Sequence, residues 1–338
     1  MERRFFLTEV VLENLLMKRK SKSYVDSLHA VLTHAGLFQG SKYVLAGYTG
    51  MAFKLSIHRR LLPMSVTAYG QWGESHRPGI DNLGIFTIWD GGRTRHPTFG
   101  YYQRDAVNWV RRSLDEGIGV IYWIPEFGVI QGYDDRDRIF YVQDGWNKEP
   151  QILLYDNFGL NFTGFWYCQV FGDQVHIPEQ QMLLESLRLA IEDWDIPYRL
   201  LPDRNIASGR LAYDVWVEAL RSEDYDESGA AYILESYWQS RTEIQMYLQD
   251  AREIWSELDQ ACACYEQLGA LILQMKKCMI QEHNRWIIQA DAIEELAQVL
   301  LEAKALEEQA VDHFRLISLK YPDRKRSTVP RWGAHSAR

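Results

Sequence analysis

The chain has 338 residues, a length that favours two domains. It carries 37 Lys and Arg against 46 Asp and Glu, a net charge of −9. That balance argues against a dedicated nucleic-acid-binding protein, which needs a basic face, and disfavours attraction to an anionic membrane surface, so we expect no nucleic-acid partner and no membrane partner. No stretch of about 18 consecutive apolar residues occurs, so we expect no membrane span.

The start of the chain and its cysteines indicate a reducing compartment. Glu9 and Glu13 interrupt the apolar beginning, so we expect no signal peptide. The spacing of the four cysteines fits neither a disulfide framework nor a zinc site. They are Cys168, Cys262, Cys264 and Cys278. We therefore expect a cytoplasmic protein.

The first predicted element is a helix over residues 26–35. Its apolar residues recur at helical spacing, and Gly36 stands where a helix end favours glycine. Ser23 lies at or near the start of this helix. Helix starts favour serine as a plain cap, which is the preferred interpretation, but they also favour anionic groups and nucleophiles.

Residues 43–100 predict short strands and turns. We expect strands over 63–69 and 85–89, and a turn at 90–93. An amphipathic helix is predicted over 105–114, followed by a strand over 119–124.

The segment from Glu126 to Asp144 predicts a hairpin. Apolar runs closing at Ile130 and starting at Ile139 flank an acidic turn, and one carboxylate stands at each outer end. These two acids either form a site or merely solvate strand ends, and the second interpretation is preferred. With further strands over 151–155 and 164–170, residues 1–175 are expected to be an α+β domain, a helix followed by a mostly antiparallel sheet.

Beyond Pro178 the pattern becomes helical. Helices are predicted over 179–194, over 208–220 with Ser208 as cap, and over 229–238, before two long helices. The long helices cover 244–275 and 292–317, and a break around Asn284 allows them to form a hairpin. Residues 176–321 are thus expected to be a helical domain, and residues 322–338 a disordered basic tail.

Residue chemistry gives little support for a metal or for catalysis. His29 and His34 are five apart on one helix, which does not direct both rings to one ion, so we expect no metal and no cofactor. Cys168 is interpreted as a core residue. A nucleophilic Ser23 would need a base, and Glu126 is a poor one because an ordinary carboxylate has a pKa of about 4.3.

Four motifs together resemble a known superfamily. They are Ser23-Tyr-Val-Asp-Ser-Leu-His-Ala-Val-Leu-Thr-His-Ala-Gly36, Gly47-Tyr-Thr-Gly-Met-Ala-Phe53, Glu126 through Gly132-Tyr-Asp134 with Tyr141-Val-Gln-Asp144, and Gly209-Arg-Leu-Ala-Tyr-Asp-Val-Trp216. In these motifs the chain resembles the papain-like cysteine peptidases, in the branch of the bacteriocin-leader peptidases and the butirosin biosynthesis protein H N-terminal domain. The resemblance covers roughly residues 20–220.

The resemblance implies where a site would lie. The family's cysteine position falls at Ser23 or Tyr24, its histidine position at Glu126, and its aspartate position at Asp144. Because cysteine supplies the nucleophile and histidine relays the proton, losing both should abolish thiol chemistry. The resemblance also implies a ligand cleft, with five candidate residues. These are Gly47, Gly50, Phe53, Tyr133 and Tyr213.

Three functional hypotheses follow. The first is a divergent, non-catalytic bacterial member of this superfamily that binds a peptide, carrier-tethered or small-molecule ligand, in a natural-product biosynthesis setting that the resemblance suggests. The second is an active acyltransferase or hydrolase that uses Ser23 or Tyr24 with Glu126 and Asp144. The third is a structural protein that forms homodimers through its long C-terminal helices.

Overall fold

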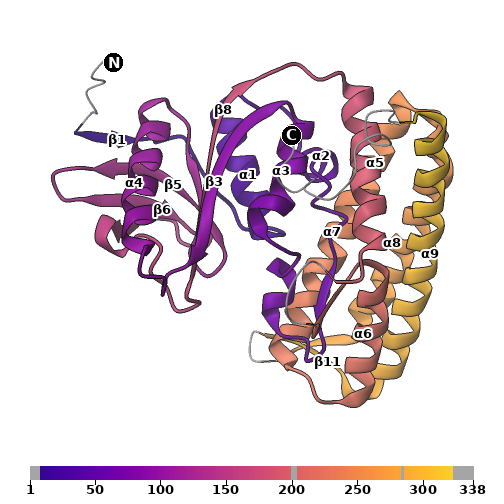
Figure 1. The fold of residues 1–338 in the computed structure, drawn as a ribbon. Coiled ribbons are helices and arrows are strands. Elements are labelled where there is room, and N and C mark those ends of the chain that lie inside the picture. The colour runs from indigo at the N-terminus through magenta and orange to yellow at the C-terminus, as the bar shows by residue number, and fades with distance from the viewer. Residues whose placement is uncertain (1–7, 199–203, 283–284, 323–338) are drawn as a thin grey trace. The chain divides into compact units, whose positions relative to one another are not determined.

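The computed structural model describes residues 8–198, 204–282 and 285–322, which divide into two compact units (Figure 1). Unit 1 comprises Met1–Leu45 and Leu83–His176, and unit 2 comprises Ala46–Asn82 and Ile177–Arg338. Residues 46–82 therefore group with the helical unit, although we assigned all of 1–175 to the first domain. The expected tail lies outside the described residues from position 323 onward.

Unit 1 is built on an antiparallel sheet of seven strands. The strands run in the order β3-β8-β4-β5-β6-β7, and β1 pairs with the end of β5. Their bounds are β1 Glu9–Val11, β3 Ile85–Arg93, β4 Val120–Trp123, β5 Phe127–Asp134, β6 Ile139–Gln143, β7 Gln151–Leu154 and β8 Phe165–Gln174, with a 3-10 turn, η2, at Tyr155–Asn157. The α+β class is thus confirmed for the described part of the chain.

The two faces of this sheet are covered differently. Helix α4 (Phe99–Asp115) packs on one face, where Val110 and Leu114 meet Tyr122 and Phe140 in the main apolar core of unit 1. Helix α1 (Ser23–His34) packs on the opposite face, against β4 and β5. Side chains alternate between the two faces along a strand, and the register of β5 places Phe127 on the face that α1 covers.

Two expectations for unit 1 were wrong in detail. The predicted turn at 90–93 is the continuation of β3, because Gly91 is needed for close approach of strands: a Cβ there would lie 2.8 Å from the Trp166 carbonyl oxygen. Strand β5 continues past Ile130 through a register shift to Asp134, where β1 pairs with it. The predicted helix over 105–114 is confirmed as α4, which begins earlier.

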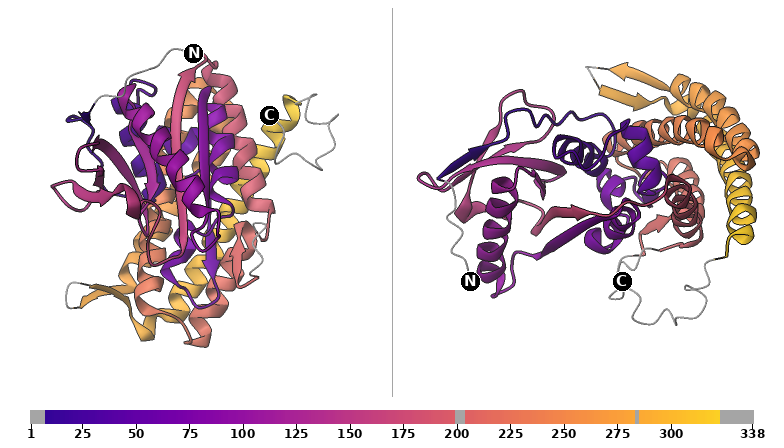
Figure 2. Two further views of the ribbon diagram at one scale, coloured as in Figure 1. Left: turned by 60° about the vertical axis from the view of Figure 1, so that its left-hand side comes forward. Right: turned by 90° about the horizontal axis from the view of Figure 1, so that it is seen from above.

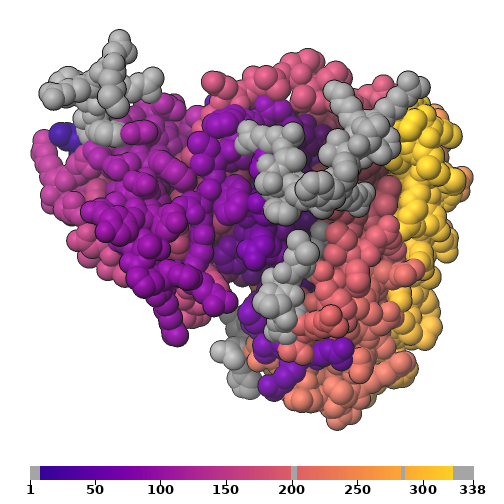
Figure 3. All heavy atoms as spheres, viewed as in Figure 1, coloured from indigo at the N-terminus to yellow at the C-terminus, as the bar shows by residue number. Residues whose placement is uncertain are grey.

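Unit 2 is mainly helical, and the division between the units falls within α2. Its elements are α2 Lys42–Tyr48, β2 Ser56–His58, η1 Pro63–Thr67, α3 Trp72–Asn82, α5 Glu179–Asp195, β9 Ile206–Ser208, α6 Gly209–Ser222, α7 Glu227–Ile254, η3 Ser256–Leu258, α8 Asp259–Lys277, β10 Met279–Glu282, β11 Arg285–Ile288, η4 Ala290–Ala292 and α9 Ile293–Lys320. Helix α9 packs against α5, α6 and α8 (Figure 2) and forms an outer surface of unit 2 (Figure 3).

Several helical expectations need correction. The segment 63–69 contains a 3-10 turn instead of a strand, and residues 72–82 form a helix that we did not expect. The predicted helix over 244–275 is two helices, because the extended backbone of Trp255 ends α7 and the turn η3 follows. Asn284 lies outside the described residues, and the strands β10 and β11 on either side of it pair with each other.

The centre of unit 2 contains a buried ion pair. Arg241 of α7 donates to both carboxylate oxygens of Glu307 of α9, at 2.5 and 2.9 Å, and the two side chains are only 1% and 3% exposed. The guanidinium also lies 4.5 Å from the ring centroid of Tyr237. None of the helices described is long and apolar enough to span a membrane.

Candidate functional site

Ser23 is the first residue of α1, and its side chain faces the sheet. Its hydroxyl donates a hydrogen bond to Glu126 Oε2 and accepts one from the backbone N–H of Phe127 at 3.2 Å. The residue is 0% exposed. Lys22 is the N-cap residue and makes no side-chain capping bond, so the preferred interpretation of Ser23 as a helix cap is wrong.

Glu126 occupies a strained position in the turn between β4 and β5. The Ile124 N–H donates to the Glu126 carbonyl oxygen at 2.9 Å, which closes a three-residue turn containing Pro125. The φ of Glu126 is 138°, a value that side-chain-bearing residues rarely adopt. Its side chain is 29% exposed, so the carboxylate lies at the border between Ser23 and solvent.

Arg19 is a third member of the site that sequence reasoning did not find. It belongs to the N-terminal strap, residues 12–20, which crosses the ends of β5 and β6. Its Nη1 lies 3.9 Å from Glu126 Oε2, and its Nη2 donates to the Asp144 carbonyl oxygen at 2.8 Å. The Nε and Nη1 atoms are buried without a hydrogen-bond partner among the described residues. One arginine in a basic lead-in gives no sequence signal of this placement.

The side chain of Asp144 stabilises its own turn. The carboxylate accepts the backbone N–H groups of Trp146 and Asn147 at 2.8 and 2.9 Å, and also the side-chain amides of Asn147 and Gln151. Desolvation raises the pKa of Asp144, but these hydrogen bonds outweigh it and hold the pKa below its ordinary value. Asp144 therefore meets the site through its backbone oxygen and Arg19.

Tyr24, the alternative to Ser23, points into the interior. Its hydroxyl donates to Gln169 Oε1 at 2.9 Å, and Gln169 Nε2 in turn donates to the Thr87 hydroxyl at 2.9 Å. Burial raises the pKa of Tyr24 well above its ordinary value. Of the two residues, Ser23 is thus the one that faces Glu126.

The five cleft candidates serve packing in different parts of the chain. Tyr133 lies in unit 1, where its hydroxyl donates to Asp115 at 2.6 Å. In unit 2 the other four contact Tyr247, Leu189, Phe314 and Tyr237, respectively; they are Gly47, Gly50, Phe53 and Tyr213. None of the five lines the groove of unit 1, which lies between α4 and the strands β3 and β8.

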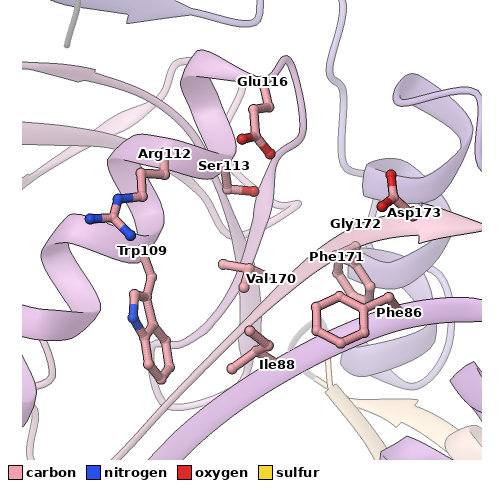
Figure 4. A pocket seen from close by; sticks show the side chains of 10 residues that line it. All are labelled: Phe86, Ile88, Trp109, Arg112, Ser113, Glu116, Val170, Phe171, Gly172 and Asp173. Carbon is pink, nitrogen blue, oxygen red and sulfur yellow. The ribbon is translucent and has the colours of Figure 1, made fainter. Parts of the chain in front are cut away.

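That groove lies between α4 and the strands β3 and β8, on the sheet face opposite α1 (Figure 4). It has a volume of about 820 Å³. Its apolar floor includes Ile88 and Val170, with Trp109 and Arg112 from α4 on one side and the carboxylate of Asp173 at the other end. The groove is therefore separate from Ser23 and Glu126, and sequence reasoning did not predict it.

Other reactive side chains are also placed in the interior. Cys168 is buried, and burial raises the pKa of its thiol far above the ordinary range, which suits a core residue and not a nucleophile. Within the described ranges no three His, Cys, Asp or Glu side chains gather as a metal ion would require.

The site can thus do limited chemistry. It presents a buried hydroxyl hydrogen-bonded to a carboxylate at the start of a helix, with a buried guanidinium beside that carboxylate. A scan against models of known protein families finds no match to the chain, and no curated protein matches it significantly.

Proposed function

We propose that the chain is a non-catalytic, divergent member of the papain-like cysteine peptidase superfamily, in the butirosin biosynthesis protein H-like branch. In this proposal Ser23 stands at the nucleophile position and Glu126 at the histidine position. The observation that supports it is the hydrogen bond from the Ser23 hydroxyl to Glu126, at the start of a helix packed on an antiparallel sheet. This contact is the one expected if serine replaced the cysteine and glutamate replaced the histidine of the superfamily's catalytic pair.

The environment of Ser23 argues against catalysis. The residue is fully buried, so the hydroxyl oxygen is not accessible to an incoming carbonyl carbon in this structure. A serine nucleophile also needs a base that takes its proton near neutral pH, which an ordinary carboxylate does badly. We infer that the contact fastens α1 to the turn between β4 and β5.

A binding role needs a surface, and the groove of unit 1 supplies one. Its volume falls in the range of about 300 to 1,000 Å³ that small-molecule sites occupy. An apolar floor with Arg112 and Asp173 at its borders suits a ligand with an apolar group and polar ends. A peptide, a carrier-tethered chain and a small molecule all have that chemistry, as the superfamily resemblance implies.

The catalytic question is tested by restoring the dyad. We expect wild-type protein to leave acyl-thioester substrates unchanged. The double variant Ser23→Cys, Glu126→His should gain a thiol whose ultraviolet thiolate absorbance appears at lower pH than in Ser23→Cys alone, because an imidazolium stabilises a thiolate. Ser27→Cys, one turn further along α1, is the matched control. Burial raises the pKa of all four native cysteine thiols, which keeps the thiolate background low.

Two outcomes would contradict the proposal. Turnover by wild-type protein that is lost in Ser23→Ala would show an active hydrolase or acyltransferase. Identical thiolate titrations in the single and double variants would show that position 126 does not act on position 23.

The binding role is tested with bis-ANS, a fluorescent probe of apolar grooves. We expect Ile88→Glu to reduce the fluorescence that the probe gains on wild-type protein, because it places a charge on the apolar floor. Phe162→Glu, at an exposed position outside the groove, should leave the gain unchanged. Equal fluorescence in all three proteins would rule the groove out as the binding surface.

A further inference from the structure

The sheet of unit 1 ends in an exposed strand. In the strand order of the described residues β7 is the last member and pairs only with β6. Two apolar side chains on it face solvent, Ile152 at 66% and Leu154 at 47% exposure. Natural proteins usually protect such an edge with charged residues, and the four residues of β7 include none.

The backbone of β7 is oriented for a further partner. The Tyr155 N–H donates to the Arg138 carbonyl oxygen at 2.9 Å, which makes these two residues a hydrogen-bonded pair. In an antiparallel ladder hydrogen-bonded and non-hydrogen-bonded pairs alternate. The N–H and C=O groups of Ile152 and Leu154 therefore point away from β6.

The exposed side chains extend an apolar strip across four strands. The register aligns Val11 with Gly132, Gly132 with Tyr141, and Tyr141 with Ile152, all on the sheet face opposite α4. The Tyr141 ring lies over Gly132, where an added Cβ would be 3.1 Å from it. The strip thus runs from β1 to the open edge and ends at Ile152.

We propose that a second copy of this chain covers this edge. Two β7 strands pair antiparallel about a two-fold axis that passes beside Leu153, so that Ile152 of each copy lies opposite Leu154 of the other. This register forms four backbone hydrogen bonds from the outward groups and joins the two apolar strips on one face. A two-fold interface must be self-complementary, and this strand is.

The charges beside β7 fit the same arrangement. Lys148 precedes the strand and Asp156 follows it, so antiparallel pairing brings the lysine of one copy to the end where the aspartate of the other lies. Pro150 lacks an N–H and ends the ladder before the strand begins. The interface is independent of the proposed function and differs from the long C-terminal helices through which we first expected homodimers.

Sedimentation of the full-length chain tests the proposal. We expect wild-type protein to sediment at twice the chain mass of 39.6 kDa, and the double variant Ile152→Lys, Leu154→Lys to sediment at once that mass. The lysines would place like charges opposite each other in the ladder. Phe162→Lys, which is outside the strand and 90% exposed, should remain dimeric. Circular dichroism confirms that each variant is folded.

A disulfide tests the register. Leu153→Cys places two thiols opposite each other at a non-hydrogen-bonded pair on the axis, where Cα atoms are about 4.5 Å apart and can be bridged. Oxidation should give a covalent dimer, whereas Leu160→Cys should give none. A wild-type monomer at every concentration, a dimer that survives the lysine variant, or no cross-link in Leu153→Cys would each overturn the proposal.

Discussion

Unit 1 and unit 2 each contain a glutamate that binds a helix, and the two are built differently. In unit 2, Glu307 receives two bonds from Arg241, and both side chains are almost completely buried. In unit 1, Glu126 is partly exposed, has a strained backbone, and lies 3.9 Å from an arginine that donates elsewhere. The first is a saturated structural contact, whereas the second lies beside guanidinium atoms of Arg19 that have no hydrogen-bond partner among the described residues.

The difference shows how a structural polar contact can be told from a candidate functional site. In the buried ion pair of unit 2 both carboxylate oxygens accept hydrogen bonds. Its role is structural, because removing either partner would leave the other charge buried and uncompensated. Backbone strain and unsatisfied guanidinium atoms around Ser23 and Glu126 have no such explanation in packing. Because strain of this kind gathers at functional sites, Ser23 and Glu126 are the candidate site of unit 1.

The largest effect should come from breaking the pair in unit 2. We expect Arg241→Met to lower the free energy of unfolding by about 3 to 5 kcal/mol, because Glu307 would remain buried without its partner. Urea denaturation followed by circular dichroism measures this. The double variant Arg241→Met, Glu307→Leu should recover most of the loss; if it is no more stable than the single variant, the pair is not the cause.

A smaller loss should follow from changing Ser23. Ser23→Ala removes the donor to Glu126 and the acceptor of the Phe127 N–H, and the cost of such buried groups is about 1 to 3 kcal/mol. Thermal and urea unfolding measure it. Ser27→Ala should cost less, because the hydroxyl of this buried serine donates to the Met17 sulfur, a weak acceptor, at 3.5 Å. Equal losses would remove the distinction between the two serines.

The buried histidine His76 should make the stability of unit 2 depend on pH. Burial, and then the charge of Lys54, lower the pKa of His76 well below its ordinary value, and its Nε2 lies 2.7 Å from the Tyr69 hydroxyl. Below a pH of about 6.5 the unfolded chain therefore binds a proton that the folded chain does not, so stability falls as pH falls. The urea midpoint should fall between about pH 7.5 and about pH 5.5 for wild type, and it should fall less for His76→Gln. An equal fall of the urea midpoint in the two proteins would contradict a role of His76.

The smallest effect should come from an exposed ion pair. Arg221 of α6 contacts Glu294 of α9 on the surface, where solvent screens the charges. We expect Arg221→Met to leave the urea midpoint unchanged within error. A clear fall in the midpoint would mean that the exposure of an ion pair does not indicate how much it contributes to stability.

The sequence predicted local periodic elements well and their long-range context poorly. The hairpin from Glu126 to Asp144 and the helices α4, α5 and α6 follow from apolar spacing and turn residues, which are local signals. The contact between Ser23 and Glu126 was anticipated only through the superfamily resemblance, since the two residues are 103 positions apart. The turn between α7 and α8 could not be anticipated, because apolar spacing of three and four continues through Trp255.

Glycine misled the interpretation where tertiary packing decides. Gly91 in β3 indicated a turn, yet the close approach of strand β8 explains it. Arg19 had no signal, because its partners are fixed only when the strap crosses the end of β6. Local sequence signals therefore predict helices and strands, whereas the candidate site depends on which helices and strands pack together in the fold.

The grouping of residues 46–82 with unit 2 has a consequence for synthesis. These residues leave the ribosome before most of unit 1, but their partners come from the C-terminal half. Gly47, for example, packs against the ring of Tyr247, which is made 200 residues later (247 − 47). Unit 1 can close around its sheet while this segment waits with apolar surface uncovered. During translation this segment therefore exposes apolar surface that the complete protein buries, and such surface favours aggregation.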